Sequence, residues 1–171
     1  MAPVNYKVFC DNIDWNIVPL LSEYEYTVKQ LNRKLFIPQR DESIVNALLE
    51  TWNITPDPKG VISCQSIRHA EKIFQMVTKF HLWKDAQLVH SNMSKQDRRM
   101  AIINFRGKNC PILIAVDILN EGVDIPNVNI VCFARVTHSR KIFVQQLGRG
   151  LRLAPGKKEV VVLDFAVDAR R

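Results

Sequence analysis

From residue 60 onward, short apolar segments alternate with segments of helical periodicity, and this alternation restricts the possible folds more than any other feature of the sequence. The apolar segments are nearly continuous and bounded by polar residues: GVISC (60–64), AQLVH (86–90), PILIAV (111–116), NIVCFA (129–134) and EVVVLDF (159–165). Strands that are buried on both faces of a parallel sheet have this character. We therefore predict an α/β fold with three layers and a mainly parallel central sheet.

Segments of helical periodicity lie between the first three of these apolar segments. Two apolar stripes recur at helical spacing, formed by Ile67, Ala70, Phe74 and Val77 and by Ala101, Ile102 and Phe105. Ser66 and Ser94 precede the two stripes and are candidate N-caps, and Asp97 follows Ser94 at the spacing of a capping box. In folds of this kind, ligands bind at the carboxyl ends of the strands.

The first fifty-odd residues follow a different pattern, which predicts two amphipathic helices ahead of the sheet. YTVKQLNRKLF (26–36) places its apolar residues on one helical face, and DESIVNALLETW (41–52) begins at Asp41, a candidate N-cap. NITPDPKG (53–60) is a proline-containing connector that ends the second helix. We therefore divide the chain into a helical and linker segment, 1–57, and an α/β domain, 58–171.

The second helix should pack on the flank of the sheet. Its apolar residues include Leu48, Leu49 and Trp52, which recur on one side of the helix and would contribute to an apolar contact. The first helix offers Val28, Leu31 and Leu35 in the same way. Together, the two helices would join the α/β domain to whatever precedes it.

Charge and cysteine usage narrow the functional classes without deciding between them. The formal net charge of +7 favours a polyanionic partner, although many basic proteins bind no nucleic acid. The four cysteines form no C-x-x-C pair, so we expect buried free thiols and a cytoplasmic location. No signal peptide and no apolar run near the ~18 residues of a membrane span is recognisable. No metal site is expected, because the four histidines lack ligand spacing.

The stretch FVQQLGRGLR (143–152) combines an apolar face with a cationic one. On a helix, Gln145, Arg149 and Arg152 share one face with Gly148, while the apolar residues gather on the other. Two guanidinium groups at the rim of a core, beside glycines that allow a close approach, suit a phosphate better than a neutral ligand. This stretch is therefore a candidate phosphate site.

Two loops that follow predicted strands carry further candidates. Ser66 and Arg68 come directly after GVISC, where a helix start offers N–H groups and positive charge to a phosphate; the alternative is a plain N-cap with a solvated arginine. DILNEGVDIP (117–126) follows PILIAV and displays Asp124 in a turn that contains Gly122. A carboxylate there can accept hydrogen bonds from ribose hydroxyls, but taken alone it is only a turn residue.

Taken in order, these stretches resemble the second RecA-like domain of superfamily 2 helicases and translocases. GVISCQSIRHAEKI is similar to motif IV of that family, LVHSNMSKQDRRMAIINF to motif IVa, ILIAVDILNEGVDIP to motif V and QQLGRGLR to motif VI. The resemblance covers about residues 58 to 165. The residues of motifs V and VI, LNEGVDIP and FVQQLGRGLR, resemble the helicase subunits of restriction and related bacterial DNA-processing enzymes more than the RNA-dependent DEAD-box group.

The resemblance implies an ATP site shared with a second domain. Arg149 and Arg152 would reach the γ-phosphate of an ATP held by that domain, and Gln145 would help to order the site. Gly122, Asp124 and Gly148 would lie near the ribose and phosphates. An arginine finger of this kind stabilises the charge that develops on the transferred phosphoryl group.

The resemblance also implies a nucleic-acid track, with DNA favoured over RNA. Ser66, Arg68 and Ser91 match positions that contact the nucleic-acid backbone in the family. One departure stands out: Val116 occupies a position in motif V where the family commonly has threonine. A hydroxyl contact with phosphate is therefore lost or moved.

Two motifs of the family's first domain, G-x-x-x-x-G-K-[ST] and D-E-x-x, do not occur in the sequence. GLRLAPGKK (150–158) is not a P-loop, because its glycines are too far apart and lysine stands in place of the hydroxyl residue. We therefore expect the carboxy-terminal half of an ATP-dependent motor, inactive as an ATPase alone, with Mg²⁺-ATP held by the N-terminal RecA-like domain of the same protein. The alternative is a basic α/β nucleic-acid-binding module without catalysis.

Overall fold

The computed structural model describes residues 4–10, 37–64, 66–116, 127–134 and 159–167. Within these ranges the strands are β1 (Val4–Cys10), β2 (Gly60–Cys64), β3 (Gln87–Val89), β4 (Ile112–Val116), β5 (Ile130–Phe133) and β6 (Val160–Val167). The helices are α3 (Ile37–Ile54), α4 (Ile67–Val77) and α5 (Lys95–Arg106), with a short 3₁₀ turn, η2 (His81–Trp83).

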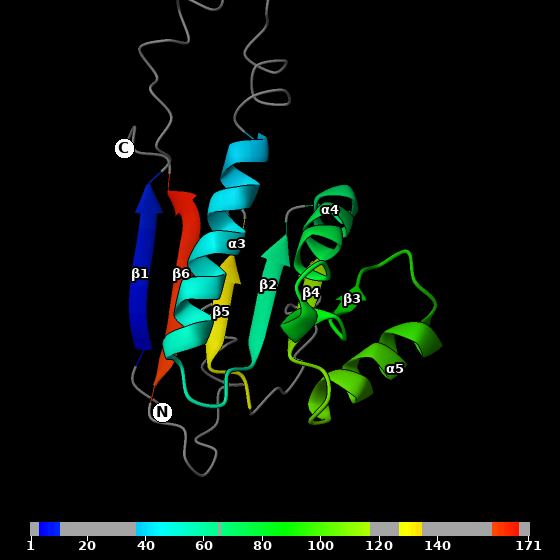
Figure 1. The fold of residues 1–171 in the computed structure, drawn as a ribbon. Helices are drawn as coiled ribbons and strands as arrows, with labels where there is room; N and C mark the ends of the chain where they lie inside the picture. Colours follow the sequence, from blue (N-terminus) through cyan, green and yellow to red (C-terminus); the bar gives the residue numbers. More distant parts are fainter. Residues whose placement is uncertain (1–3, 11–36, 65, 117–126, 135–158, 168–171) are drawn as a thin grey trace, which may run out of the picture.

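The six strands form one sheet in the order β1-β6-β5-β2-β4-β3, and every pairing is parallel (Figure 1). The sheet contains all five apolar segments, as predicted. It also contains β1, an edge strand that the sequence analysis did not predict and that pairs with β6 from Val4 opposite Val160 onward. Because all strands run the same way, their carboxyl ends share one edge of the sheet.

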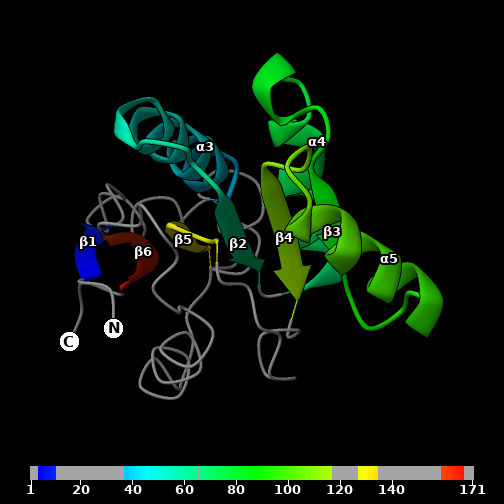
Figure 2. The same cartoon turned by 90° about the horizontal axis from the view of Figure 1, so that it is seen from below.

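Helices cover both faces of the sheet, which confirms the three-layer fold. On one face lie α3 and α4 (Figure 2). Their apolar residues form one core with strand residues such as Ile62 and Ile114. On the other face, α5 buries Phe105 against the neighbouring strand residues Val61 and Leu113. Successive strand residues point to opposite faces, so near-continuous apolar strands supply both cores at once.

The caps of α4 and α5 are confirmed. The Ser66 hydroxyl oxygen accepts a hydrogen bond from the backbone N–H of His69 at 3.2 Å. The Ser94 oxygen accepts one from the backbone N–H of Asp97 at 3.0 Å, and the Ser94 hydroxyl donates to the Asp97 carboxylate at 2.8 Å. Each cap satisfies a backbone donor that has no partner within its own helix.

The cap expected at Asp41 is wrong. Helix α3 begins at Ile37, and its second residue, Pro38, is tolerated because first-turn N–H groups need no partner within the helix. Asp41 therefore lies inside the helix, where its side chain is 1% exposed and faces α4 instead of capping α3. The expected packing of the second helix is confirmed, since Leu48 is fully buried and Leu49 and Trp52 pack against the same core.

The amino edge of the sheet is held by Asn129, which the sequence analysis did not single out. Its side-chain oxygen accepts a hydrogen bond from the backbone N–H of Lys59 at 2.8 Å, and its amide donates to the carbonyls of Pro56 and Asp57. Asp57 adopts a φ of 45°, which turns the connector sharply into β2. The domain boundary between residues 57 and 58 stays a prediction, although β1 is part of the sheet and α3 contributes to the core on one of its faces.

Three cysteines are buried free thiols, as expected: Cys64, Cys110 and Cys132. Burial raises the pKa of the Cys64 thiol to about 12, so this thiol stays protonated and unreactive at neutral pH. In the part of the chain that the structure describes, no helix is both long enough and apolar enough to cross a membrane. The helix predicted over 26–36, with Val28, Leu31 and Leu35, lies outside the described residues.

Candidate nucleic-acid interface

Three of the predicted site residues lie beyond the carboxyl ends of two strands of the sheet. Ser66 and Arg68 follow β2, and Ser91 follows β3. In the sheet, β4 lies between these two strands. The loops that carry the three residues therefore flank the end of β4, at the edge where parallel α/β sheets bind their ligands.

All three side chains are exposed at this edge. Ser66 caps the 11-residue helix α4, so its oxygen is occupied by the His69 N–H, while its hydroxyl hydrogen remains a donor. Arg68 lies in the first turn of α4, where the N-terminal N–H groups and the helix dipole favour an anion. Ser91 lies in the turn that joins β3 to α5, closed by a 3.2 Å hydrogen bond from the N–H of Met93 to the carbonyl of His90.

Val116 is the last residue of β4 and lies opposite Cys64 in the register. Its side chain is 6% exposed and belongs to the core beneath α3 and α4. A hydroxyl at this position would need a hydrogen-bond partner within the core, whereas valine packs there without one. The substitution is thus compatible with the packing, and its effect on a phosphate contact remains a prediction.

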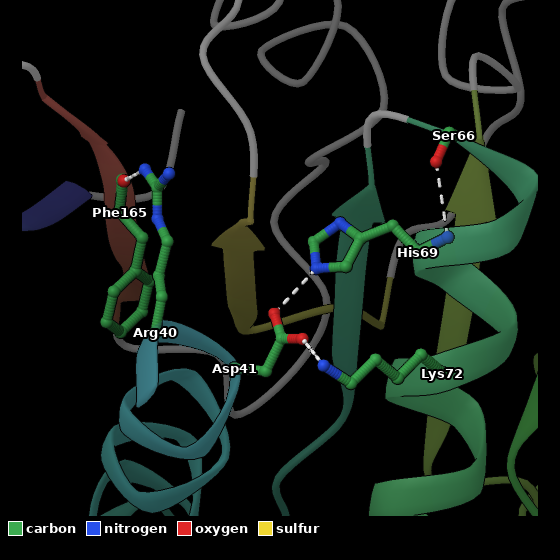
Figure 3. Close-up of polar contacts among 6 residues, drawn as sticks. All are labelled: Arg40, Asp41, Ser66, His69, Lys72 and Phe165. Atoms are coloured by element: carbon green, nitrogen blue, oxygen red, sulfur yellow. Dashed lines mark hydrogen bonds and ion pairs between the residues drawn. The ribbon is translucent and has the colours of Figure 1, made fainter. Parts of the chain in front are cut away.

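Asp41, which the sequence favours as an N-cap, is instead a buried carboxylate that contacts the first turns of α4. The Asp41 carboxylate of α3 accepts a 2.8 Å hydrogen bond at Oδ1 from His69 Nε2 and forms a 2.7 Å ion pair at Oδ2 with Lys72 Nζ (Figure 3). Burial by itself raises the pKa of Asp41, but the hydrogen bonds from His69 and Lys72 outweigh it, so the pKa lies below its ordinary value. Asp41 is therefore ionised at neutral pH.

Serine, histidine and aspartate meet here without forming a nucleophilic triad. Ser66 bonds to the backbone N–H of His69, and the imidazole Nε2 is bonded to Asp41 (Figure 3). A histidine that activates a serine must accept the proton of the hydroxyl with one ring nitrogen while the carboxylate holds the other. Together with the ion pair to Lys72, this arrangement instead ties α3 to the first two turns of α4.

The six residues predicted to serve the ATP site lie outside the described residues: Gly122, Asp124, Gln145, Gly148, Arg149 and Arg152. The strands that flank their two segments are nevertheless described. Segment 117–126 follows the end of β4, and segment 143–152 lies between β5 and β6, which are neighbours in the sheet. Their roles remain predictions.

Comparison with known families identifies the fold. Residues 39–154 match the family model of the helicase conserved C-terminal domain. The chain belongs to this helicase family. The match begins within α3 and extends through the stretch that contains Arg149 and Arg152, so it spans the candidate interface as well as the predicted arginine pair.

Relatives of this helicase domain include a restriction subunit and RNA helicases. It is 29% identical, over 94% of this chain and 26% of the relative, to the putative mitochondrial ATP-dependent helicase irc3 of Schizosaccharomyces pombe. It is 35% identical to the ATP-dependent RNA helicase DHH1 of Encephalitozoon cuniculi, over 86% of this chain and 28% of the relative. It is 30% identical to the type I restriction enzyme EcoKI endonuclease subunit of Escherichia coli, over 80% and 12%. The chain thus spans between about an eighth and about a quarter of these relatives.

Solved structures show the same fold. The C-terminal domain of the DEAD-box protein Dbp5 superimposes with a TM-score of 0.61 at 18% identity, over 98% of this chain and 78% of that one. The Hef helicase domain of Pyrococcus furiosus gives a TM-score of 0.59 at 22% identity, over 77% of this chain and 26% of that one. Together with the family match and the helicase relatives, this likeness confirms the resemblance to superfamily 2 helicases.

Proposed function

We propose that this helicase domain is the second motor domain of an ATP-dependent helicase or translocase that moves along DNA. The observation that carries the proposal is the placement of Ser66, Arg68 and Ser91, which are all exposed and flank the end of β4 at the carboxyl edge of the sheet. Exposed hydroxyl and guanidinium groups beside a helix N-terminus suit the phosphates of a nucleic-acid backbone. The net charge of +7 favours the same partner.

In this proposal, one set of residues binds nucleic acid and another set serves the ATP site. Arg68 neutralises a backbone phosphate, while Ser66 and Ser91 donate hydrogen bonds and fix the register of the strand. Contacts with phosphates do not depend on the base sequence. A motor that steps along any strand requires contacts of this kind. The preference for DNA is supported by the likeness of motifs V and VI to restriction-type subunits, one of which is among the relatives.

The ATP half of the proposal rests on Arg149 and Arg152. When the two motor domains close, these guanidinium groups would meet the γ-phosphate, with Gln145 ordering them and with Gly122, Asp124 and Gly148 near the ribose and phosphates. The Mg²⁺ that accompanies ATP neutralises phosphate charge and would be held by the first domain, so no residue of this chain is assigned to it. We also assign the protein to the cytoplasm, supported by its buried free thiols.

The second candidate is a basic α/β module that binds nucleic acid without catalysis. It is favoured by the exposed phosphate-binding groups, which would serve such a module equally well. A module that only binds has no need for two arginines on one helical face, and their presence in QQLGRGLR therefore favours the motor.

Replacing Arg68 by alanine tests the interface. We expect weaker binding of the 171-residue chain to single-stranded DNA and a slope of log K against log salt that is smaller by about 0.7, because one phosphate contact is lost. Fluorescence anisotropy titrations at several salt concentrations measure both quantities. An RNA of the same sequence, titrated in parallel, tests the substrate: equal or tighter RNA binding would contradict the preference for DNA.

The matched control is Lys79→Ala, which removes one exposed positive charge beyond the opposite end of α4. It should change affinity much less than Arg68→Ala. If the two variants lose affinity equally, binding reflects overall charge, and the interface at the carboxyl edge is wrong.

A further inference from the structure

Two consecutive residues fasten the first turns of α3 to two other elements. The Arg40 guanidinium donates a hydrogen bond to the backbone carbonyl of Phe165 in β6 (Figure 3). The next residue, Asp41, contacts His69 and Lys72 of α4 on the other side. Since β6 and β2 both end at the carboxyl edge, this fastening lies behind the proposed nucleic-acid interface.

Burying the charged Asp41 carboxylate between two helices costs free energy. Its side chain is 1% exposed, and removing a charged carboxylate from water carries a large penalty that its partners only offset. Apolar residues of similar size often pack two helices at equal or lower cost. Unlike apolar packing, an ion pair with a defined hydrogen bond fixes the orientation of one helix relative to the other.

The geometry fixed by Asp41 is that of the helix turns that carry the interface. His69 and Lys72 are three residues apart and so present one face of α4 to α3. The backbone N–H of His69 also donates to the Ser66 oxygen, and Arg68 directly precedes His69. Rotation of α4 about its axis would move Ser66 and Arg68 and would break both Asp41 contacts.

We propose that Asp41 is a positioning residue for nucleic-acid binding: through His69 and Lys72 it sets the orientation of the first turns of α4, and hence the direction of Arg68 and Ser66 toward the phosphate backbone. The inference rests on the proposed function, because it takes Arg68 and Ser66 as the contacting groups. Asp41 itself would not touch nucleic acid.

Replacing Asp41 by asparagine separates positioning from overall charge. Asparagine keeps the shape but removes the negative charge, and it can turn an amide N–H₂ toward the Lys72 ammonium. Overall electrostatics predicts tighter DNA binding by the variant, whereas positioning predicts binding weaker by about threefold to tenfold, the size of one lost charged contact. Anisotropy titration of the 171-residue chain with single-stranded DNA gives the sign directly.

Two control variants lie on the same helix. Glu42→Gln makes the same charge change at an exposed neighbouring position and should leave affinity unchanged or slightly tighter. Val45→Ala destabilises the buried face of α3 without touching the ion pair, and should bind as wild type at a temperature where thermal melts show every variant folded. If Val45→Ala weakens binding as much as Asp41→Asn, general loosening explains the loss and the inference fails.

A double-mutant cycle with Arg68→Ala tests whether Asp41 affects DNA binding through Arg68. In the Arg68→Ala background, we expect Asp41→Asn to change affinity by less than about twofold, because the group that it positions is gone. Fully additive losses, or tighter binding by Asp41→Asn alone, overturn the inference while leaving the interface intact. If Arg68→Ala alone has no effect, the proposed interface is wrong, and the inference falls with it. Should Asp41→Asn fail to fold, His69→Ala, which leaves Asp41 paired with Lys72, enters the same cycle with the same expectations.

Discussion

Replacing Arg152 by alanine is expected to lower kcat for ATP by about 10³-fold in a longer chain that carries the first motor domain, with only a modest change in nucleotide Kd. Under the proposed function, the guanidinium meets the γ-phosphate mainly when the domains close. Its stabilisation is therefore larger in the transition state than on initial ATP binding. Steady-state ATPase rates at saturating ATP and DNA, with a separate nucleotide-binding titration, measure the two effects.

The conservative variant Arg152→Lys is the control for charge. It should recover little activity, because an ammonium keeps the charge but loses the planar fork that can bridge two phosphate oxygens. If Arg152 merely pairs with a surface carboxylate, its loss would cost about 0–1 kcal/mol and leave hydrolysis nearly unchanged. Near-normal turnover of Arg152→Ala would therefore remove the arginine-finger assignment.

Replacing Trp83 by alanine is expected to lower the free energy of unfolding by about 3–5 kcal/mol. Trp83 is fully buried and packs edge-on against two aromatic rings, with centroid distances of 5.6 Å to Trp52 and 5.2 Å to Phe80. Alanine would leave a large cavity between α3 and the segment after α4. Urea denaturation followed by circular dichroism gives the change, and a loss below about 1 kcal/mol would contradict the packing.

Trp83→Phe is the matched variant. In the described part of the structure, the buried indole N–H of Trp83 has no hydrogen-bond acceptor, and an unsatisfied buried donor is itself costly. Phenylalanine keeps an aromatic ring in the site and removes that donor, so its cost should stay within about 1.5 kcal/mol. A loss as large as that of alanine would contradict this expectation.

The sequence predicts the central strands and the caps of α4 and α5 well, because their causes are local. β2, β4 and β5 are buried on both faces, so almost every residue in them must be apolar. Ser66 and Ser94 cap helices through backbone groups three residues away, which a spacing rule can detect. The placement of Ser66 and Arg68 at this edge also follows from local patterns, because parallel strands bring their carboxyl ends together. Ser91 was predicted only from the family resemblance.

The parts that the sequence does not predict depend on distant partners. β1 is an edge strand whose place beside β6 is decided by residues at the other end of the chain. The period-two pattern of VNYKVFC, with Val4, Tyr6 and Val8 alternating with Asn5 and Lys7, was the available signal.

Asp41 was misread for the same reason. An acidic residue ahead of an apolar helical stripe is typical of an N-cap, and only the position of α4, with His69 lying 28 residues further along the chain, gives it another task. A charged residue on the apolar side of its own helix was the one available indication. Local rules describe a residue's neighbours in sequence, and a buried ion pair between helices is decided by tertiary packing.

We propose that this helicase domain provides one half of a shared ATP site. The most direct test compares DNA-stimulated ATP hydrolysis by the 171-residue chain with that of a longer chain that includes the first motor domain, at saturating ATP and DNA. We expect turnover that DNA stimulates in the longer chain and none above background in the 171-residue chain. DNA-stimulated turnover by the 171-residue chain alone, or its absence from the longer chain, would contradict a shared ATP site.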